Sequence, residues 1–369
     1  MSSRTAAART SSWALPSSSP IASSGGALGA PVVRDLLAHP LGAVQAVGSE
    51  ALLSGPTAPP DEAIGLLLGS GHDEVRAAAV RLLKRLPDAE LVRRPRIIAR
   101  LLAHAQVDLR TAGRELGQRL TAADPSFGPA LTGELVAALV RNLLPEGAGA
   151  WLLEVLLHDL ALSLATLEGA AVIRLLRSRG KHAQELGGLL LIGRPELGAT
   201  FTVDELAQLC HHEVLAVRQA AFALLQGDLP RLQGDVMGAI RALDSPWDDA
   251  RSWMAAVFRE QLTADDLPIE VLVAIVDSVR PDIEALGREL LRRHFRDPDG
   301  ATLMLQLSEH PAPGVQLMVT ELFDRFAAGR PEQIRGLIPF FTMALGRVNR
   351  GRAVKQRVLA FLHAQAERD

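Results

Sequence analysis

Apolar residues in this chain recur at the spacing of an α-helix. Val75, Ala79 and Leu83 fall at positions i, i+4 and i+8, which places them on one face of a helix. The same pattern occupies residues 217–225 and 283–291. Strand-like alternation rich in Ile, Thr and aromatic residues is not visible. The pattern therefore predicts amphipathic helices, each of which buries one apolar face.

These predicted helices form a repeat. Each begins near a two-residue marker, and neighbouring markers are 31 to 41 residues apart. A period of this size indicates one small structural unit stacked many times. The ten markers are Val44-Gln45, Val75-Arg76, Leu109-Arg110, Ala150-Trp151, Ala183-Gln184, Val217-Arg218, Ala250-Arg251, Ile283-Glu284, Val315-Gln316 and Val354-Lys355.

A small residue usually follows the first marker residue by four positions. Glycine inside a helix costs about 1 kcal/mol relative to alanine, so its recurrence at one phase of the repeat needs a reason in the packing. We expect a neighbouring helix to approach closely at these positions. They are Gly48, Ala79, Gly113, Gly187, Ala221 and Gly287.

A second predicted helix precedes most markers. Thr202–Glu205 and Thr263–Asp266 have the capping-box pattern, and Ser245 stands where a capping serine would precede a Pro at the first helical position. The chain is therefore expected to consist of helix pairs. The candidate first helices are 90–104, 129–143, 160–177, 203–211, 235–243, 268–279, 301–308 and 331–345.

The composition agrees with an all-α protein. Hydrophobic residues make up 48% of the 369 residues, yet Tyr is absent and aromatic residues are only 4%. The core must therefore be aliphatic, chiefly Leu, Ala and Val, and Leu and Ala are strong helix formers.

Residues 72–83 resemble the second helix of a HEAT repeat. That family favours an Asp just before the helix, then Val-Arg, a small residue and paired leucines, and Asp73, Val75-Arg76, Ala79 and Leu82-Leu83 stand at these places. The period of about 33 residues is similar to that of short bacterial HEAT-like repeats, including those of the bilin-lyase type. Partial matches occur at 107–110, 249–251 and 282–284, and the resemblance covers roughly residues 35–366.

The resemblance implies an architecture and a class of function. It implies an armadillo-like α-solenoid of about ten HEAT-like helix pairs over residues 31–369, with the second helices on the concave side. HEAT proteins mostly act as scaffolds, so the expected function is non-enzymatic binding of another protein through that face. Asp and Arg at repeating positions are expected to form a structural ladder. They are Asp73, Arg76, Asp108, Arg110, Arg218 and Arg251.

The N-terminal segment differs from the rest of the chain. Residues 1–30 are mostly Ser, Ala, Gly and Pro, and no acidic residue occurs before Asp35. This composition predicts a disordered tail, because it offers little apolar surface to bury. A targeting peptide is the alternative, since Arg- and Ser-rich leaders without acids have the same composition.

Two features are candidates for recognition. Trp247 falls at a predicted helix start, where we expect it to be exposed, and an exposed Trp near Arg is typical of interfaces. Residues 347–357 carry five cations and no acid, which is consistent with a solvated loop or with an anion-binding patch. The binding candidates are Trp247, Arg347, Arg350, Arg352, Lys355 and Arg357.

No motif for catalysis or metal binding stands out. The densest cluster of ligand types is 210–213, but neighbouring helical residues such as His211 and His212 point about 100° apart. We therefore expect no catalytic residue, no cofactor and no metal. The chain has one cysteine, a net charge of −3 and no apolar stretch of membrane-spanning length, which favours a soluble cytoplasmic protein.

Two other functions remain open. One is binding of nucleic acid through the C-terminal basic residues, as in DNA glycosylases built from HEAT-like repeats, although the negative net charge and scarce aromatics do not favour it. The other is an enzyme similar to the bilin lyases.

Overall fold

The computed structural model describes residues 29–55, 58–296, 300–307, 310–346 and 352–368. Every regular element within these ranges is a helix, so the predicted all-α class is confirmed. Residues 1–28 of the predicted tail lie outside the described residues, and Ala30, its last residue, begins the first helix.

The chain divides into two compact units, Met1–Glu134 and Leu135–Asp369. The boundary falls within α8, Phe127–Arg141. The helices of the first unit before α8 are α1 Ala30–Leu37, α2 Gly42–Ser54, α3 Asp61–Leu68, α4 Asp73–Arg85, α5 Asp88–Leu91, α6 Pro95–Leu102 and α7 Val107–Ala123.

The second unit continues with both α-helices and two short 3₁₀ segments, η1 and η2. They are α9 Ala148–His158, α10 Ala161–Ala165, α11 Gly169–Leu176, α12 Lys181–Ile192, η1 Pro195–Thr200, α13 Val203–Leu209, α14 Leu215–Gly227, α15 Leu229–Gly234, α16 Val236–Ala239, η2 Ile240–Asp244, α17 Asp248–Glu260, α18 Ile269–Val276, α19 Pro281–His294, α20 Gly300–Leu307, α21 Pro313–Phe326, α22 Pro331–Gly336, α23 Ile338–Gly346 and α24 Arg352–Ala366.

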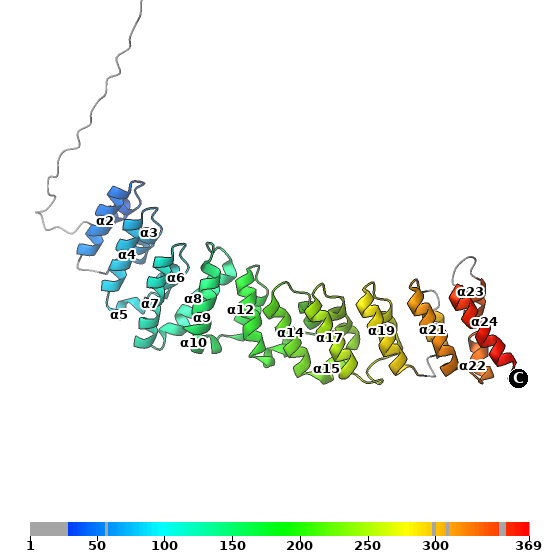
Figure 1. The fold of residues 1–369 in the computed structure, drawn as a ribbon. Coiled ribbons are helices and arrows are strands. Elements are labelled where there is room, and N and C mark those ends of the chain that lie inside the picture. Colours follow the sequence, from blue (N-terminus) through cyan, green and yellow to red (C-terminus); the bar gives the residue numbers. More distant parts are fainter. Residues whose placement is uncertain (1–28, 56–57, 297–299, 308–309, 347–351, 369) are drawn as a thin grey trace, which may run out of the picture. The chain divides into compact units, whose positions relative to one another are not determined.

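Within each unit, the helices that carry the markers pack side by side (Figure 1). In the first unit, α2 contacts α4 and α4 contacts α7, while α1, α3 and α6 form a second row in which each contacts the next. In the second unit, each of α9, α12, α14, α17, α19, α21 and α24 contacts the next. We call these marker-bearing helices the second helices, and the helices that precede them in each pair the first helices.

The core between the two rows is aliphatic, as the composition requires. The first marker residue is buried in seven pairs, with exposed fractions from 0 to 4% for Val75, Leu109, Ala183, Val217, Ala250, Ile283 and Val315. Burial of these apolar faces is the main favourable contribution to folding.

The recurrent small residue has the expected packing role. A Cβ added to Gly287 would lie 2.6 Å from the backbone nitrogen of Val276 in α18, and one added to Gly187 would lie 2.8 Å from that of Leu176 in α11. Real Cβ contacts are not this short. Glycine therefore lets the two helices of these pairs approach until their backbones nearly touch.

Several predicted helix ends differ from the structure. The predicted helix 160–177 is two helices, α10 and α11, because residues 166–168 leave the helix before α11. The predicted helix 331–345 is likewise divided, into α22 and α23. Thr202 does form a capping box with Glu205, whereas Thr263 bonds to Asp266 within a turn that starts no helix.

Candidate interaction surface

The second residue of each marker, which we call the marker position, ties its helix to the turn before it. At six marker positions the side chain donates a hydrogen bond to the backbone carbonyl six residues earlier. The bond satisfies a carbonyl of the turn that has no partner within a helix. The bonds are Gln45 to His39 (2.8 Å), Arg76 to Ser70, Gln184 to Ser178 (2.8 Å), Arg218 to His212 (2.8 Å), Arg251 to Ser245 (2.7 Å) and Gln316 to His310 (2.6 Å).

Three of the four arginines at marker positions, Arg76, Arg218 and Arg251, also reach the next helix pair. Arg218 donates from Nε and Nη2 to Oδ2 of Asp249, at 3.0 and 2.9 Å. The Nε–H groups of the other two donate to Gln106 Oε1 (Arg76, 2.8 Å) and to Asp282 Oδ2 (Arg251, 3.1 Å). Each guanidinium therefore joins two successive pairs, which its five fixed donors allow and a lysine ammonium would not.

The ladder residues predicted from the sequence have different places in this arrangement. Asp73 contacts Arg76 within one helix, and the Asp73 pKa is lowered by hydrogen bonds from Gln106 and Arg76. Arg218 and Arg251 contact carboxylates outside the predicted set. The other two predicted members lie near the start of α7, where Asp108 is exposed and Arg110 is buried.

A second recurrent group was missed from the sequence. In seven turns, a His or Ser stands six residues before the marker position. Its side chain accepts a hydrogen bond from the backbone N–H of the residue two positions later, and that residue is the N-cap of the second helix. The acceptors are His39, Ser70, His104, His212, Ser245, Ser278 and His310, with distances of 3.0 to 3.2 Å. Each acceptor lies six residues before its marker position in the sequence, and this constant spacing is the signal that could have identified the group. Ser245 thus lies two residues before the N-cap, and not at the N-cap as predicted.

His104 illustrates the chemistry of these turns. Its Nδ1 accepts from the N–H of Gln106, and its Nε2 lies 3.2 Å from the carbonyl oxygen of Leu68 in the preceding pair. A neutral ring with the proton on Nε2 satisfies both contacts. Burial lowers the pKa of His104, and burial also lowers the pKa of His212 in the equivalent turn. Both rings are therefore held neutral near pH 7.

Trp247 lies on one of these turns, at the start of α17. Its Nε1–H donates to the carbonyl of His211 in the preceding turn, at 3.2 Å, and the guanidinium carbon of Arg218 lies 4.4 Å from the ring centroid. The residue is 37% exposed. It therefore combines a structural contact with an accessible aromatic surface.

Other large apolar side chains are exposed on the neighbouring turns. Leu215 is the first residue of α14, and Val279 lies just before the N-cap of α19. Leu215 is 50% exposed and Val279 is 96% exposed. Leu215, Trp247 and Val279 lie three, four and five residues before the marker positions Arg218, Arg251 and Glu284, so they stand at or beside three successive turns of the second unit but not at equivalent places in them. We call these three residues the turn row.

The C-terminal basic residues are only partly described. Arg347 and Arg350 lie outside the described residues. Arg352 is exposed at the start of α24, and Lys355 is half-buried. Arg357 is engaged, because its Nη1 lies 3.5 Å from a carboxylate oxygen of Glu321 and donates to the carbonyl of Leu317 at 3.4 Å.

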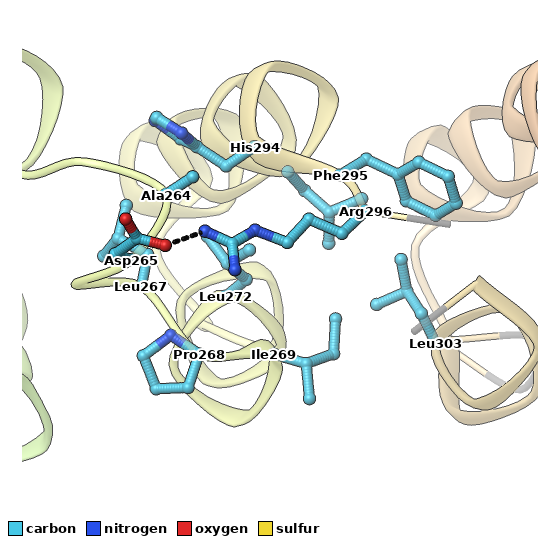
Figure 2. A pocket seen from close by; sticks show the side chains of 11 residues that line it. Ala264, Asp265, Leu267, Pro268, Ile269, Leu272, His294, Phe295, Arg296 and Leu303 are labelled. Carbon is cyan, nitrogen blue, oxygen red and sulfur yellow. Dashed lines mark hydrogen bonds and ion pairs between the residues drawn. The ribbon is translucent and has the colours of Figure 1, made fainter. Parts of the chain in front are cut away.

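A small pocket lies beside α18, α19 and α20 (Figure 2). Its volume is about 170 Å³, and its lining combines apolar side chains, including Leu272, Phe295 and Leu303, with the polar side chains of Asp265, His294 and Arg296. Arg296 extends toward Asp265 and pairs with it at 2.6 Å. The carboxylate and the guanidinium in the lining thus neutralise each other.

The cysteine and histidine cluster does not converge on one point. Cys210 is buried, its Sγ contacts the carbonyl of Leu206 at 3.5 Å, and burial raises its pKa to about 12. His211 and His212 make separate contacts, to the carbonyl of Arg241 and the N–H of Val214. In the described ranges, no group of three or more His, Cys, Asp or Glu residues is placed to hold a metal ion.

None of the helices that the structure describes combines the length and the apolar character needed to cross a bilayer. No protein-family model matches this chain, and no curated protein matches it.

Proposed function

We propose that this chain is a non-enzymatic scaffold or adaptor, built as a HEAT-like α-solenoid, that holds another protein along the face of its second helices. One observation carries the proposal. Equivalent positions about 33 residues apart make equivalent contacts, as Arg218 and Arg251 do with Asp249 and Asp282. Contacts that repeat in register are what a one-dimensional stack requires, and such stacks provide extended binding surfaces.

The second helices offer a surface for this role. In α14 the exposed residues Leu215, Gln219, Ala223 and Gln226 follow one another at helical spacing, opposite the buried stripe. In α17, Ser252 occupies a comparable exposed position. Because the second helices pack side by side, these stripes adjoin one another within the unit. A partner held there would contact several helix pairs at once.

The proposal assigns the protein to the cytoplasm. The only cysteine of the chain, Cys210, is buried and cannot form a disulfide within the chain. Stability therefore comes from apolar burial and arginine contacts, which suit a reducing compartment.

Site-specific photocrosslinking tests the proposed function. A photoreactive residue at position 219 or 252 reports on the second helices, and one at position 237 or 270 reports on exposed positions of the first helices. We expect the first pair to crosslink to one protein in cell extract, and the purified protein to bind the full chain directly. Crosslinks confined to positions 237 and 270, or none at all four, would contradict the proposed function.

A further inference from the structure

In the ion pairs made by Arg218 and Arg251, the more exposed partner is always the negatively charged carboxylate. The side chains of Arg218 and Arg251 are 7% and 12% exposed, whereas that of Asp248, which pairs with Arg251, is 90% exposed. Asp249 and Asp282, which accept hydrogen bonds from Arg218 and Arg251 of the preceding pair, have side chains that are 38% and 57% exposed. The guanidinium groups thus lie beneath the surface, and the carboxylates lie at its rim.

Other charged groups near the turn row are also mainly acidic at the surface. Glu213 is exposed and lies in the inter-helix turn that precedes the turn of Trp247. Asp277 lies two residues before Val279, and its side chain is 73% exposed. Two further arginines are present: Arg241 is paired with Asp204 at 3.0 Å, and Arg280 is half-buried. An approaching group therefore meets carboxylates before it meets guanidinium groups, and the nearer charges dominate.

We infer that the turn row of the second unit binds a Lys- or Arg-rich segment of a partner protein that also carries apolar side chains. This inference rests on the proposed function and names the partner's chemistry. Leu215, Trp247 and Val279 supply apolar anchors, and the carboxylates between them attract cations. A nucleic acid or an acidic segment would be repelled by the same rim.

The spacing of the turn row restricts the geometry of that segment. Packed helices lie about 8–10 Å apart, so the turns that carry the three anchors are separated by a similar distance. Residues seven apart in a helix are about 10.5 Å apart, and residues three apart in an extended chain are about 10 Å apart. Apolar residues at either spacing, with basic residues between them, would match the row.

The test begins with a photoreactive residue at position 279, compared with one at position 219 on the face of α14. Mass spectrometry then identifies the crosslinked segment of the partner. A segment with a net positive charge and apolar residues supports the inference. Capture at position 219 without capture at 279, or capture of an acidic segment, a nucleic acid or a second copy of this chain at 279, overturns it and leaves the proposed function standing. No capture at either position overturns both.

A charge exchange at one exposed position completes the test. The captured segment is synthesised and titrated against the full-length chain carrying Val279→Lys or Val279→Glu. Val279 is almost fully exposed, so neither change disturbs the core. We expect the Lys variant to bind at least about fivefold more weakly than the Glu variant at low salt, with the difference shrinking as salt is added. Equal affinities, or weaker binding by the Glu variant, would overturn the inference. Glu260→Lys, at the opposite end of α17, is the matched control and should leave the affinity unchanged.

Discussion

The two ends of the second helices both carry arginines that join successive helix pairs, but they differ in burial. At the N-terminal end, Arg218 is 7% exposed and bonds to carbonyls, a carboxylate and an aromatic face. At the C-terminal end, Arg259 pairs with Glu289 of the next pair at 2.9 Å, and both side chains are exposed. Arg218 donates to its carboxylate from two nitrogens and Arg259 from one. Because the two contacts differ in burial, we expect loss of the arginine at the buried end to cost more stability than loss of the exposed ion pair.

The C-terminal end has a recurrent contact of its own. The arginine lies near the C-terminal end of a second helix, nine residues after its marker position. Its side chain donates to a backbone carbonyl of the preceding second helix, at the residue eight positions after that helix's own marker position. Each bond satisfies a carbonyl that its own helix end leaves without a partner. The bonds are Arg85 to Leu53 (3.0 Å), Arg293 to Arg259 (2.9 Å) and Arg325 to Arg292 (3.0 Å).

Removal of a buried arginine should have the largest effect. Arg218→Ala removes the donor to Oδ2 of Asp249 and to the carbonyl of His212, so we expect the free energy of unfolding to fall by about 3 kcal/mol. Arg218→Lys should recover only a part of this loss, because an ammonium group cannot reproduce the several bonds that the planar guanidinium makes in fixed directions. Thermal and urea denaturation followed by circular dichroism measure both. Full recovery by Lys would show that charge alone matters at this end.

Closure of a helix–helix contact should have the next largest effect. Gly287→Ala places a methyl group 2.6 Å from the backbone of Val276, so we expect destabilisation by about 2 kcal/mol. Gly133→Ala is the control, because Gly133 is exposed within α8 and an added Cβ meets nothing within 4 Å. That variant should be stabilised by up to about 1 kcal/mol. Equal effects of the two changes would contradict the close approach.

Acid should weaken the turns that contain His104 and His212. Burial lowers the pKa of His104 and His212 below the ordinary 6.5, so the unfolded chain takes up protons first as the pH falls. Stability should therefore decrease as the pH drops through about 6.5 toward the folded pKa values. Replacement of His104 by Ser, the residue of the equivalent turns at 70 and 245, should reduce this dependence. Stability measured from pH 8 to pH 5 tests this, and the exposed His363→Ser provides the comparison.

The exposed C-terminal ion pair should have the smallest effect. Arg259→Ala removes a contact between side chains that are 41% and 50% exposed, so we expect a loss of at most about 0.5 kcal/mol. The loss should shrink further in high salt. A loss comparable to that of Arg218→Ala would remove the distinction between the two ends.

The sequence predicted the helical class, the repeat and the buried phase of the second helices, because each of these follows from apolar periodicity. It also predicted that the recurrent glycines mark close contacts, as at Gly287. It did not predict that His104 and Ser245 share one role, since a turn acceptor is defined by the backbone N–H it faces and not by its residue type. The exposure of Val279 also could not be read from the sequence, because an apolar residue at the end of a predicted helix is usually assigned to its buried face.

Deletion of one whole repeat tests the account most directly. Removal of residues 248–280 joins Trp247 to Pro281 and brings Asp282 to the place of Asp249, where Arg218 can bind it. If the helix pairs are equivalent modules in register, the shortened chain will remain helical and unfold cooperatively. Removal of residues 248–260 alone takes out α17 but leaves α18, so the alternation of first and second helices is broken, and cooperative unfolding should be abolished. Loss of folding in the whole-repeat deletion, or equal behaviour of the two deletions, would contradict the account.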